Sequence, residues 1–152
     1  MTRLHVVLVD DHPLVRDGIR QILSNDATIQ VVGEASSGAE ALNLCRELAP
    51  DVMVLDIRLP DMNGVQVLDE LQKEALDTRV LVLSAHDDQE YIKALIQKGI
   101  GGYLLKDELI DHIVEAVHGV GRGEEGWLSR RIAARLSSAP VSYTHLRAHE
   151  TK

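Results

Sequence analysis

Five polar side chains stand at or just after the ends of short apolar runs: Asp10, Asp11, Asp56, Ser84 and Lys106. A carboxylate such as that of Asp56 can accept a phosphoryl group, because it can form an acyl phosphate. Three carboxylates gathered in one place repel one another, by roughly 4 kcal/mol for two charges about 4 Å apart near a protein surface. A cation should therefore join them, and Mg²⁺ suits a site of few carboxylates, water and phosphate oxygens.

Phosphoryl transfer needs mainly positioning and charge neutralisation. Lys106 can bring positive charge to the phosphoryl oxygens, and the Ser84 hydroxyl can donate a hydrogen bond to one of them. Each residue alone also has an ordinary explanation. The two N-terminal acids could cap a helix, Ser84 could mark a helix entry, and the lysine could be solvated.

The apolar runs that precede these residues have strand length, at 4–9, 29–35, 52–55, 80–83 and 103–105. Apolar residues at helical spacing separate them, which predicts helices at about 13–24, 36–49, 65–74, 87–98 and 108–118. Pro13 suits the first turn of its helix, since a proline lacks only an N–H that would be unpaired there. Pro50 ends the second helix.

Each connection between strands is long enough for a helical crossover, so the strands should be parallel. Right-handed crossovers then place helices on both faces. The predicted fold is α/β, a doubly wound five-stranded parallel sheet with five helices. Ligands bind such sheets at the carboxyl ends of the strands. The polar residues follow the first, third, fourth and fifth strands, so they should converge at one edge, and as an ordered set they are a strong signal.

The net charge of −8 is unevenly spread along the 152 residues. Residues 1–120 carry −11 and residues 121–152 carry +3. An acidic body argues against nucleic-acid binding by this chain. No apolar run approaches the roughly 18 residues of a membrane helix and no signal peptide is expected, so we expect a cytoplasmic protein with no membrane contact. Cys45 stands at helical spacing from Leu42, which predicts a buried core residue.

These residues together resemble a bacterial two-component response-regulator receiver domain over about residues 3–118. The pattern is Asp10-Asp11, then Asp56 followed by Leu59-Pro60-Asp61-Met62-Asn63-Gly64, then Ser84-Ala85 and Lys106. The stretches Asp10-Asp11-His12-Pro13-Leu14 and Gly126-Trp127-Leu128-Ser129 are most similar to the NarL/FixJ subgroup. In that subgroup the second stretch leads to a helix-turn-helix output domain.

The resemblance implies a flavodoxin-like strand order of 2-1-3-4-5 and phosphotransfer from a sensor histidine kinase to Asp56. It implies Mg²⁺ held by Asp11, Asp56 and the Arg58 backbone carbonyl, with Asp10 acting through water. It also implies that Ser84 and Tyr103 shift together on phosphorylation, and that the protein forms a homodimer. DNA would be bound only through a C-terminal domain that this chain lacks.

Three regions are expected along the chain. Residues 1–119 form the receiver domain, and residues 120–140 form a glycine-rich linker with a short basic helix capped by Ser129. Residues 141–152 show no apolar period and resemble no part of the family, so we expect them to be non-native or disordered. Tyr103 is expected to be half-buried, and His118 is expected on a solvated helix surface or at a helix end.

Two alternative functions remain open. The first is a phosphohydrolase that works through an aspartyl phosphate, but such enzymes usually carry a second acid two residues after the nucleophile, where this chain has Arg58. The second is a pseudo-receiver that binds partners without phosphorylation, against which the full set of site residues argues. His12 could also be a metal ligand, but a hard-oxygen Mg²⁺ site does not need imidazole.

Overall fold

The computed structural model describes residues 3–85, 89–124, 126–128 and 130–135. Within these ranges a parallel sheet has the strand order β2-β1-β3-β4-β5-β6. The strands are β1 (Leu4–Val9), β2 (Ile29–Ala35), β3 (Val52–Asp56), β4 (Arg79–Ser84), β5 (Gly102–Leu105) and β6 (Trp127–Leu128). The helices are α1 (Pro13–Ser24), α2 (Gly38–Leu48), α3 (Gly64–Lys73), α4 (Gln89–Gln97), α5 (Leu109–Gly121) and α6 (Arg130–Arg135). The predicted order of the first five strands is confirmed.

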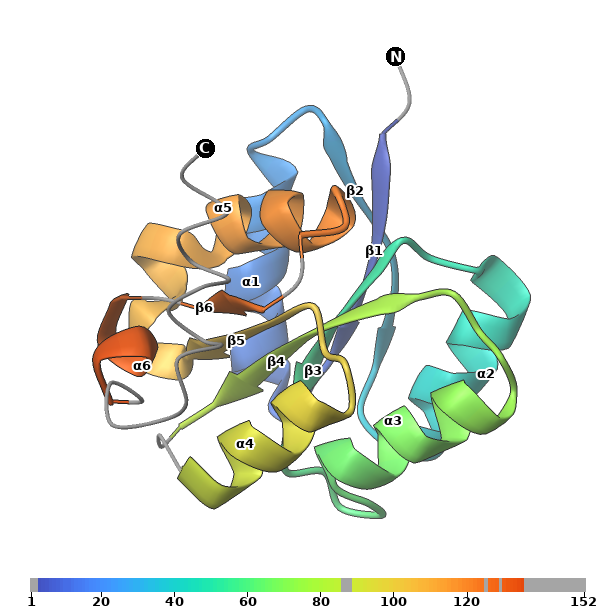
Figure 1. The fold of residues 1–152 in the computed structure, drawn as a ribbon. Coiled ribbons are helices and arrows are strands. Elements are labelled where there is room, and N and C mark those ends of the chain that lie inside the picture. The colour runs from blue at the N-terminus through green and yellow to red at the C-terminus, as the bar shows by residue number, and fades with distance from the viewer. Residues whose placement is uncertain (1–2, 86–88, 125, 129, 136–152) are drawn as a thin grey trace.

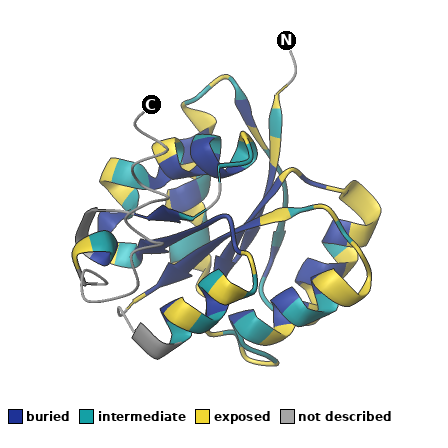
Figure 2. Cartoon of the chain, in the orientation of Figure 1, coloured by how far each residue is buried: buried dark blue, intermediate teal, exposed yellow. Residues whose placement is uncertain are grey.

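The sheet lies between two layers of helices, as the doubly wound prediction requires (Figure 1). One apolar cluster joins α1 and α5 to one face of the sheet. The other joins α2, α3, α4 and α6 to the opposite face, and it contains the buried Cys45, as predicted. Successive residues of β1, such as Val6 and Val7, belong to different clusters because side chains alternate along a strand. Figure 2 shows the strands buried and the outer helix surfaces exposed.

Local sequence explains where the helices begin. Pro13 is the first residue of α1, as predicted. The Ser37 side chain accepts a hydrogen bond from the Glu40 N–H and so caps α2. Asn63 and Gln66 form a reciprocal capping box at the start of α3, which fixes the direction in which the chain leaves the β3–α3 loop.

The segment after α5 differs from the predicted linker. Helix α5 continues to Gly121, and Trp127–Leu128 then pairs with Gly102–Tyr103 as a sixth strand. Two glycines make room for it. A Cβ at Gly119 would lie 2.8 Å from Trp127 Cδ1, and a Cβ at Gly102 would lie 2.9 Å from the Trp127 carbonyl oxygen. Residues 120–140 were interpreted as a glycine-rich linker, whereas Trp127–Leu128 within this range packs closely against these two glycines.

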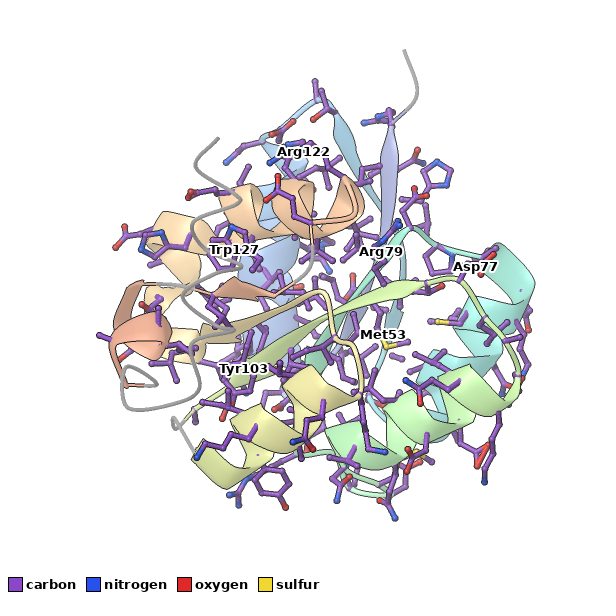
Figure 3. The ribbon with its side chains drawn as sticks, in the orientation of Figure 1. Met53, Asp77, Arg79, Tyr103, Arg122 and Trp127 are labelled. Carbon is purple, nitrogen blue, oxygen red and sulfur yellow. The ribbon has the colours of Figure 1, made fainter. Side chains whose placement is uncertain are left out.

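The sixth strand also changes the surroundings of Tyr103. This side chain is fully buried, so the expectation of half-burial was wrong. It lies in the same apolar cluster as Leu128 and Ile132, which come from β6 and α6. Figure 3 places Tyr103 on the side of the sheet that faces α4 and Trp127 beside α5. The outer edge of β5 is therefore covered by the chain's own later segment.

His118 lies in the last turn of α5, but it is less solvated than predicted, because the imidazole is half-buried against the loop between α1 and β2. Its Nε2 lies 2.9 Å from Asp26 Oδ2 and 3.2 Å from the Thr28 hydroxyl. The Thr28 hydroxyl donates to Asp26 Oδ1 at 2.5 Å. Hydrogen bonds from Thr28, and then from His118, lower the pKa of Asp26 to about 2.

This lowered pKa predicts a pH dependence of stability. Because the folded-state pKa of Asp26 lies below its ordinary value of 3.8, its contribution is complete above that value and is lost as the pH falls toward about 2. We expect Asp26→Asn to lower the thermal unfolding midpoint by a few degrees at pH 7 and by less at pH 2.5. Thermal unfolding followed by circular dichroism across this range checks it. An equal loss at both pH values would contradict the prediction.

No helix among the described residues is both long enough and apolar enough to cross a membrane. Three sequence predictions lie outside the described residues: the start of the fourth helix at Asp87, the Ser129 cap and the nature of residues 141–152.

Candidate functional site

The predicted site residues, apart from Tyr103, gather at the carboxyl edge of the sheet. Asp10 follows β1, Asp56 ends β3, Ser84 ends β4 and Lys106 follows β5. A cavity of about 370 Å³ opens there, and its lining includes Asp11, His12, Asp56, Arg58, Ser84 and Lys106. Asp10 is 1% exposed and contacts Lys106 at this site. The convergence predicted from parallel strands is therefore present.

A buried ion-pair triad organises the site. Lys106 Nζ lies 3.1 Å from Asp56 Oδ2 and 3.3 Å from Asp10 Oδ2. Both carboxylates are almost completely buried, so their charges depend on this ammonium for compensation inside the protein. Although burial lowers the pKa of Lys106, the hydrogen bond to Asp56 and the charges of both acids raise it above its ordinary value, so the lysine is charged at neutral pH.

The environment of Asp56 raises its pKa. Burial is the largest cause, and the nearby charge of Asp10 adds to it. The Arg58 backbone N–H, which donates to Asp56 Oδ1 at 3.2 Å, and the Lys106 ammonium act in the opposite direction. A carboxylate with a raised pKa is a more basic nucleophile, and the Lys106 ammonium favours its charged form.

The acidic residues of the site fit a divalent cation. One ligand atom from each of Asp10, Asp11, His12 and Asp56 lies within 4.8 Å of the others. Asp10 Oδ2 is buried, and within the described part of the chain its charge is compensated by the Lys106 ammonium at 3.3 Å without a regular hydrogen bond. Buried charged oxygens require compensation. A hard cation such as Mg²⁺, bound through carboxylate oxygens and water, suits this set.

The β3–α3 loop, which carries Arg58, is fixed at both ends. Arg58 pairs with Asn63 across the loop, and the Gly64 N–H donates to the Ile57 carbonyl at 2.9 Å. The Asp61 carboxylate accepts hydrogen bonds from the Gly38 and Ala39 N–H groups at the start of α2, at 2.8 and 3.0 Å. These hydrogen bonds, the one from Gly38 first, lower the pKa of Asp61. The loop beside the nucleophile is thereby tied to a neighbouring helix.

Sequence reasoning did not assign these roles to Asp61 or to Arg16. One guanidinium nitrogen of Arg16 donates to the Asp10 carbonyl at 2.6 Å, and another lies 3.3 Å from a Glu34 carboxylate oxygen. Both contacts join residues of different elements, so local spacing carries no signal for them. The Arg16 contact supports the backbone of Asp10, and the Asp61 contacts support the loop that follows Asp56.

The two proposed switch residues occupy different places. Ser84 is 5% exposed and lines the cavity, and its strand position pairs with Leu105. Tyr103 lies two residues earlier in β5, in the apolar cluster beneath α4 rather than in the cavity lining. Ser84 therefore lies at the site itself, whereas Tyr103 lies outside the cavity lining.

Comparisons with known proteins agree with this arrangement. A family model described as "Response regulator receiver domain" matches residues 6–118. NarL of Escherichia coli K12, named a nitrate/nitrite response regulator, is 39% identical over 119 residues, covering 78% of this chain and 55% of that protein. A NarL of Mycobacterium tuberculosis is 43% identical over 147 residues, covering 92% and 67% respectively. The chain thus spans about half to two thirds of these relatives.

Two solved structures extend the similarity to the fold. The signal receiver domain of NarL from Mycobacterium tuberculosis matches with a TM-score of 0.78 and 43% identity, covering 81% of this chain and 99% of that one. A two-component response regulator of the LuxR family from Aurantimonas sp. SI85-9A1 matches with a TM-score of 0.84 and 28% identity, covering 90% and 97%.

Proposed function

This chain belongs to the response regulator receiver family, and on that premise we propose that it is a signalling switch phosphorylated on Asp56 by a sensor histidine kinase. One observation carries the proposal. The buried Asp56 carboxylate lines a cavity between the Lys106 ammonium and an acidic cluster suited to Mg²⁺. This combination supplies a nucleophile, a counter-charge and a metal site, which are the groups that phosphoryl transfer requires.

The step forms one bond and breaks another. An Asp56 carboxylate oxygen attacks the phosphorus of the donor, and an acyl phosphate forms. The bond from phosphorus to the donor's histidine nitrogen, or to the carboxylate oxygen of acetyl phosphate, breaks, and its electron pair leaves with the donor. The Lys106 ammonium and the Ser84 hydroxyl are placed to hold phosphoryl oxygens. Mg²⁺, held by Asp10, Asp11, Asp56 and the Arg58 carbonyl, would supply further positive charge to them.

Position 58 argues for a switch over a turnover enzyme. Arg58 stands two residues after the nucleophile, where a hydrolase would need an acid, and its side chain is exposed at the cavity. No positioned carboxylate then activates water there, so the acyl phosphate should persist and decay slowly. The protein would be a self-dephosphorylating receiver, not a phosphatase.

The direct test is phosphorylation by a small donor. With Mg²⁺ and acetyl phosphate, the intact mass should rise by one phosphoryl group, and Asp56→Asn should show no gain. Asp51→Asn is a matched control, because Asp51 lies at the opposite end of β3 and should leave phosphorylation intact. The same gain in the Asp56 variant, or no gain in the unaltered protein, would refute the proposal.

A docking face for the kinase adjoins the site. Leu14 and Ile110 are each the second residue of a helix that begins at the site edge, and they are 86% and 82% exposed. Helices α1 and α5 pack together, so the two apolar side chains belong to one surface. Large exposed apolar groups beside a site typically mark protein contacts.

This face predicts a separation of donors. We expect Leu14→Asp to slow phosphotransfer from a kinase at least tenfold, while phosphorylation by acetyl phosphate stays within about twofold, since burying a charge in an interface costs affinity. The kinase for this experiment is chosen from a panel of autophosphorylated sensor kinases as the one that transfers its phosphoryl group to the unaltered protein fastest. Equal slowing with both donors would place the effect in the chemistry instead.

The output of the switch follows from the family and from the placement of Ser84 and Tyr103. We propose that the two shift together on phosphorylation and alter the face formed by α4, β5 and α5. We further propose a cytoplasmic protein that dimerises and acts on transcription through a C-terminal DNA-binding domain. The names of its relatives as transcriptional regulators support this proposal.

A further inference from the structure

We infer that His12 is an additional ligand of the metal at this site and shifts its preference toward transition-metal ions. The inference rests on the proposed function, because it concerns the same metal site. The sequence argued against it, since carboxylates alone satisfy Mg²⁺. The structure places the imidazole directly on the carboxylates that would bind the ion.

The geometry of His12 carries the first step. Its Nδ1 lies 2.9 Å from Asp10 Oδ1 and 3.0 Å from Asp11 Oδ1. The His12 backbone N–H donates to the same Asp10 oxygen at 2.8 Å. Together with Asp56, these groups offer four ligand atoms within 4.8 Å of one another. The imidazole nitrogen is thus part of the same compact group of ligand atoms as the carboxylates.

The position of His12 in the chain supports a role outside its own helix. It is the residue before α1, where Ser, Thr, Asp or Asn would normally cap, and its side chain makes no capping hydrogen bond. Pro13 holds the preceding residue in an extended conformation, and the His12 dihedral angles of φ −102° and ψ 106° agree. The side chain is therefore held toward the site and not toward the helix.

A second observation points to a ligand at this place. Asp10 is 1% exposed, and no described residue makes a regular hydrogen bond to its Oδ2, although Lys106 Nζ lies 3.3 Å away. One ammonium is shared between two buried carboxylates, while the other Asp10 oxygen faces His12. A cation bound by the Asp10 carboxylate would compensate its buried charge, and the His12 imidazole, which contacts Oδ1 of the same carboxylate, is placed to share in binding that cation. With its hydrogen on Nε2, a neutral imidazole presents the Nδ1 lone pair to a metal.

The ligand types determine which ions benefit. Carboxylate oxygens suit Mg²⁺ and Mn²⁺, whereas imidazole suits Co²⁺, Ni²⁺ and Zn²⁺. A site of three carboxylates and one imidazole should therefore hold Co²⁺ more tightly than its oxygens alone would. Oxygen-only sites also prefer Co²⁺ over Mn²⁺. The order of the metal affinities therefore does not test the inference. The test is whether the affinity for Co²⁺ depends on His12.

Calorimetric titration of the full chain with Mg²⁺ and with Co²⁺ tests the inference. We expect His12→Phe to weaken Co²⁺ binding about tenfold or more and to change Mg²⁺ binding by less than about twofold. His12→Asn keeps a hydrogen-bond donor near the carboxylates but lacks the imidazole, and it should lose Co²⁺ affinity as well. In the unaltered protein with ¹⁵N-labelled histidine, pulsed EPR of bound Mn²⁺ should show a nitrogen coupling that His12→Phe abolishes.

The outcomes separate this inference from the proposed function. Equal effects of His12→Phe on both ions, or no effect on either, would overturn the inference and leave the receiver assignment intact. If the unaltered protein showed no binding of a divalent cation that Asp11→Asn abolishes, both the inference and the proposed function would be overturned. Retention of Co²⁺ affinity in His12→Asn would show that hydrogen bonding, not ligation, is the role, and this too would overturn the inference.

Discussion

Replacing Lys106 by methionine is expected to destabilise the protein by about 3 kcal/mol at pH 7, because it leaves two buried carboxylates without their counter-charge. The Lys106 ammonium lies between Asp56 and Asp10, at 3.1 and 3.3 Å, and both acids are almost fully buried. Methionine keeps most of the apolar stem of lysine and removes the charge. The effect then reports the ion-pair triad and not a cavity.

The pH dependence of the loss has a definite sign. The pKa of Lys106 is raised, so its stabilisation is complete below its ordinary value of 10.5 and is lost as pH rises through the folded-state value. Without the ammonium, the already raised pKa of Asp56 should rise further. The folded variant would then bind a proton that the unfolded chain releases. The methionine variant should therefore recover stability as pH falls from 7 to 5.

Urea unfolding at pH 5 and pH 7 measures this, with a double-mutant cycle as the control. Asp10→Asn removes one of the repelling charges, so the loss caused by Lys106→Met should be smaller in that background. The Lys106 variant should also fail to hold the phosphoryl group in its active geometry. A loss below about 0.5 kcal/mol that is the same at both pH values would mean that the triad is solvated and carries little energy.

The sequence pattern allowed prediction of the strands and of the convergence of the site, while the order of the strands was implied by the resemblance to receiver domains. Each strand is an apolar run that ends at a polar residue, and the parallel arrangement follows from helix-length connections. The prediction that Asp56, Ser84 and Lys106 line one cavity therefore needed no information about contacts between them. The covalent order of the chain was sufficient there, because strand ends fix side-chain positions to within one residue.

What could not be predicted depends on contacts between distant elements. Tyr103 was expected to be half-buried, and it is fully buried in a sheet that Trp127–Leu128 extends beside β5. That pairing requires the absence of side chains at Gly102 and Gly119, and nothing in the local sequence around these glycines shows which segment packs against them. The direction of the His12 side chain could not be predicted either, since residue type alone does not show where a side chain at a helix start points.

Replacing Trp127 by alanine is expected to cost about 3 kcal/mol of stability, as is usual when a large aromatic side chain is removed from a core. Trp127 is 8% exposed and belongs to the apolar cluster that contains Val117 and Val120 of α5. The backbone N–H of Trp127 donates to the Gly101 carbonyl at 2.9 Å, and this hydrogen bond begins the pairing of β6 with β5. Without the indole, the two-residue strand has little to hold it against the sheet edge.

Removing Trp127 should also affect the proposed switch residue Tyr103, because loss of β6 would uncover Tyr103 and the edge of β5. An uncovered edge strand is a template for pairing with another chain. We therefore expect Trp127→Ala to self-associate more than the unaltered protein in sedimentation, besides unfolding at lower urea. Trp127→Phe should keep most of the packing and lose less than about 1.5 kcal/mol.

Gly102→Ala tests the same packing of β6 against β5, with the change made in β5. Its Cβ would meet the Trp127 carbonyl oxygen at 2.9 Å, so backbone must move to accept it. We expect a loss of about 1–3 kcal/mol, the usual cost of overpacking, and a red shift in the emission of Trp127, the single tryptophan of the chain. If both variants retained full stability with unchanged emission, β6 would not be a packed part of the receiver. The segment after α5 would then be the flexible linker that its glycines first indicated.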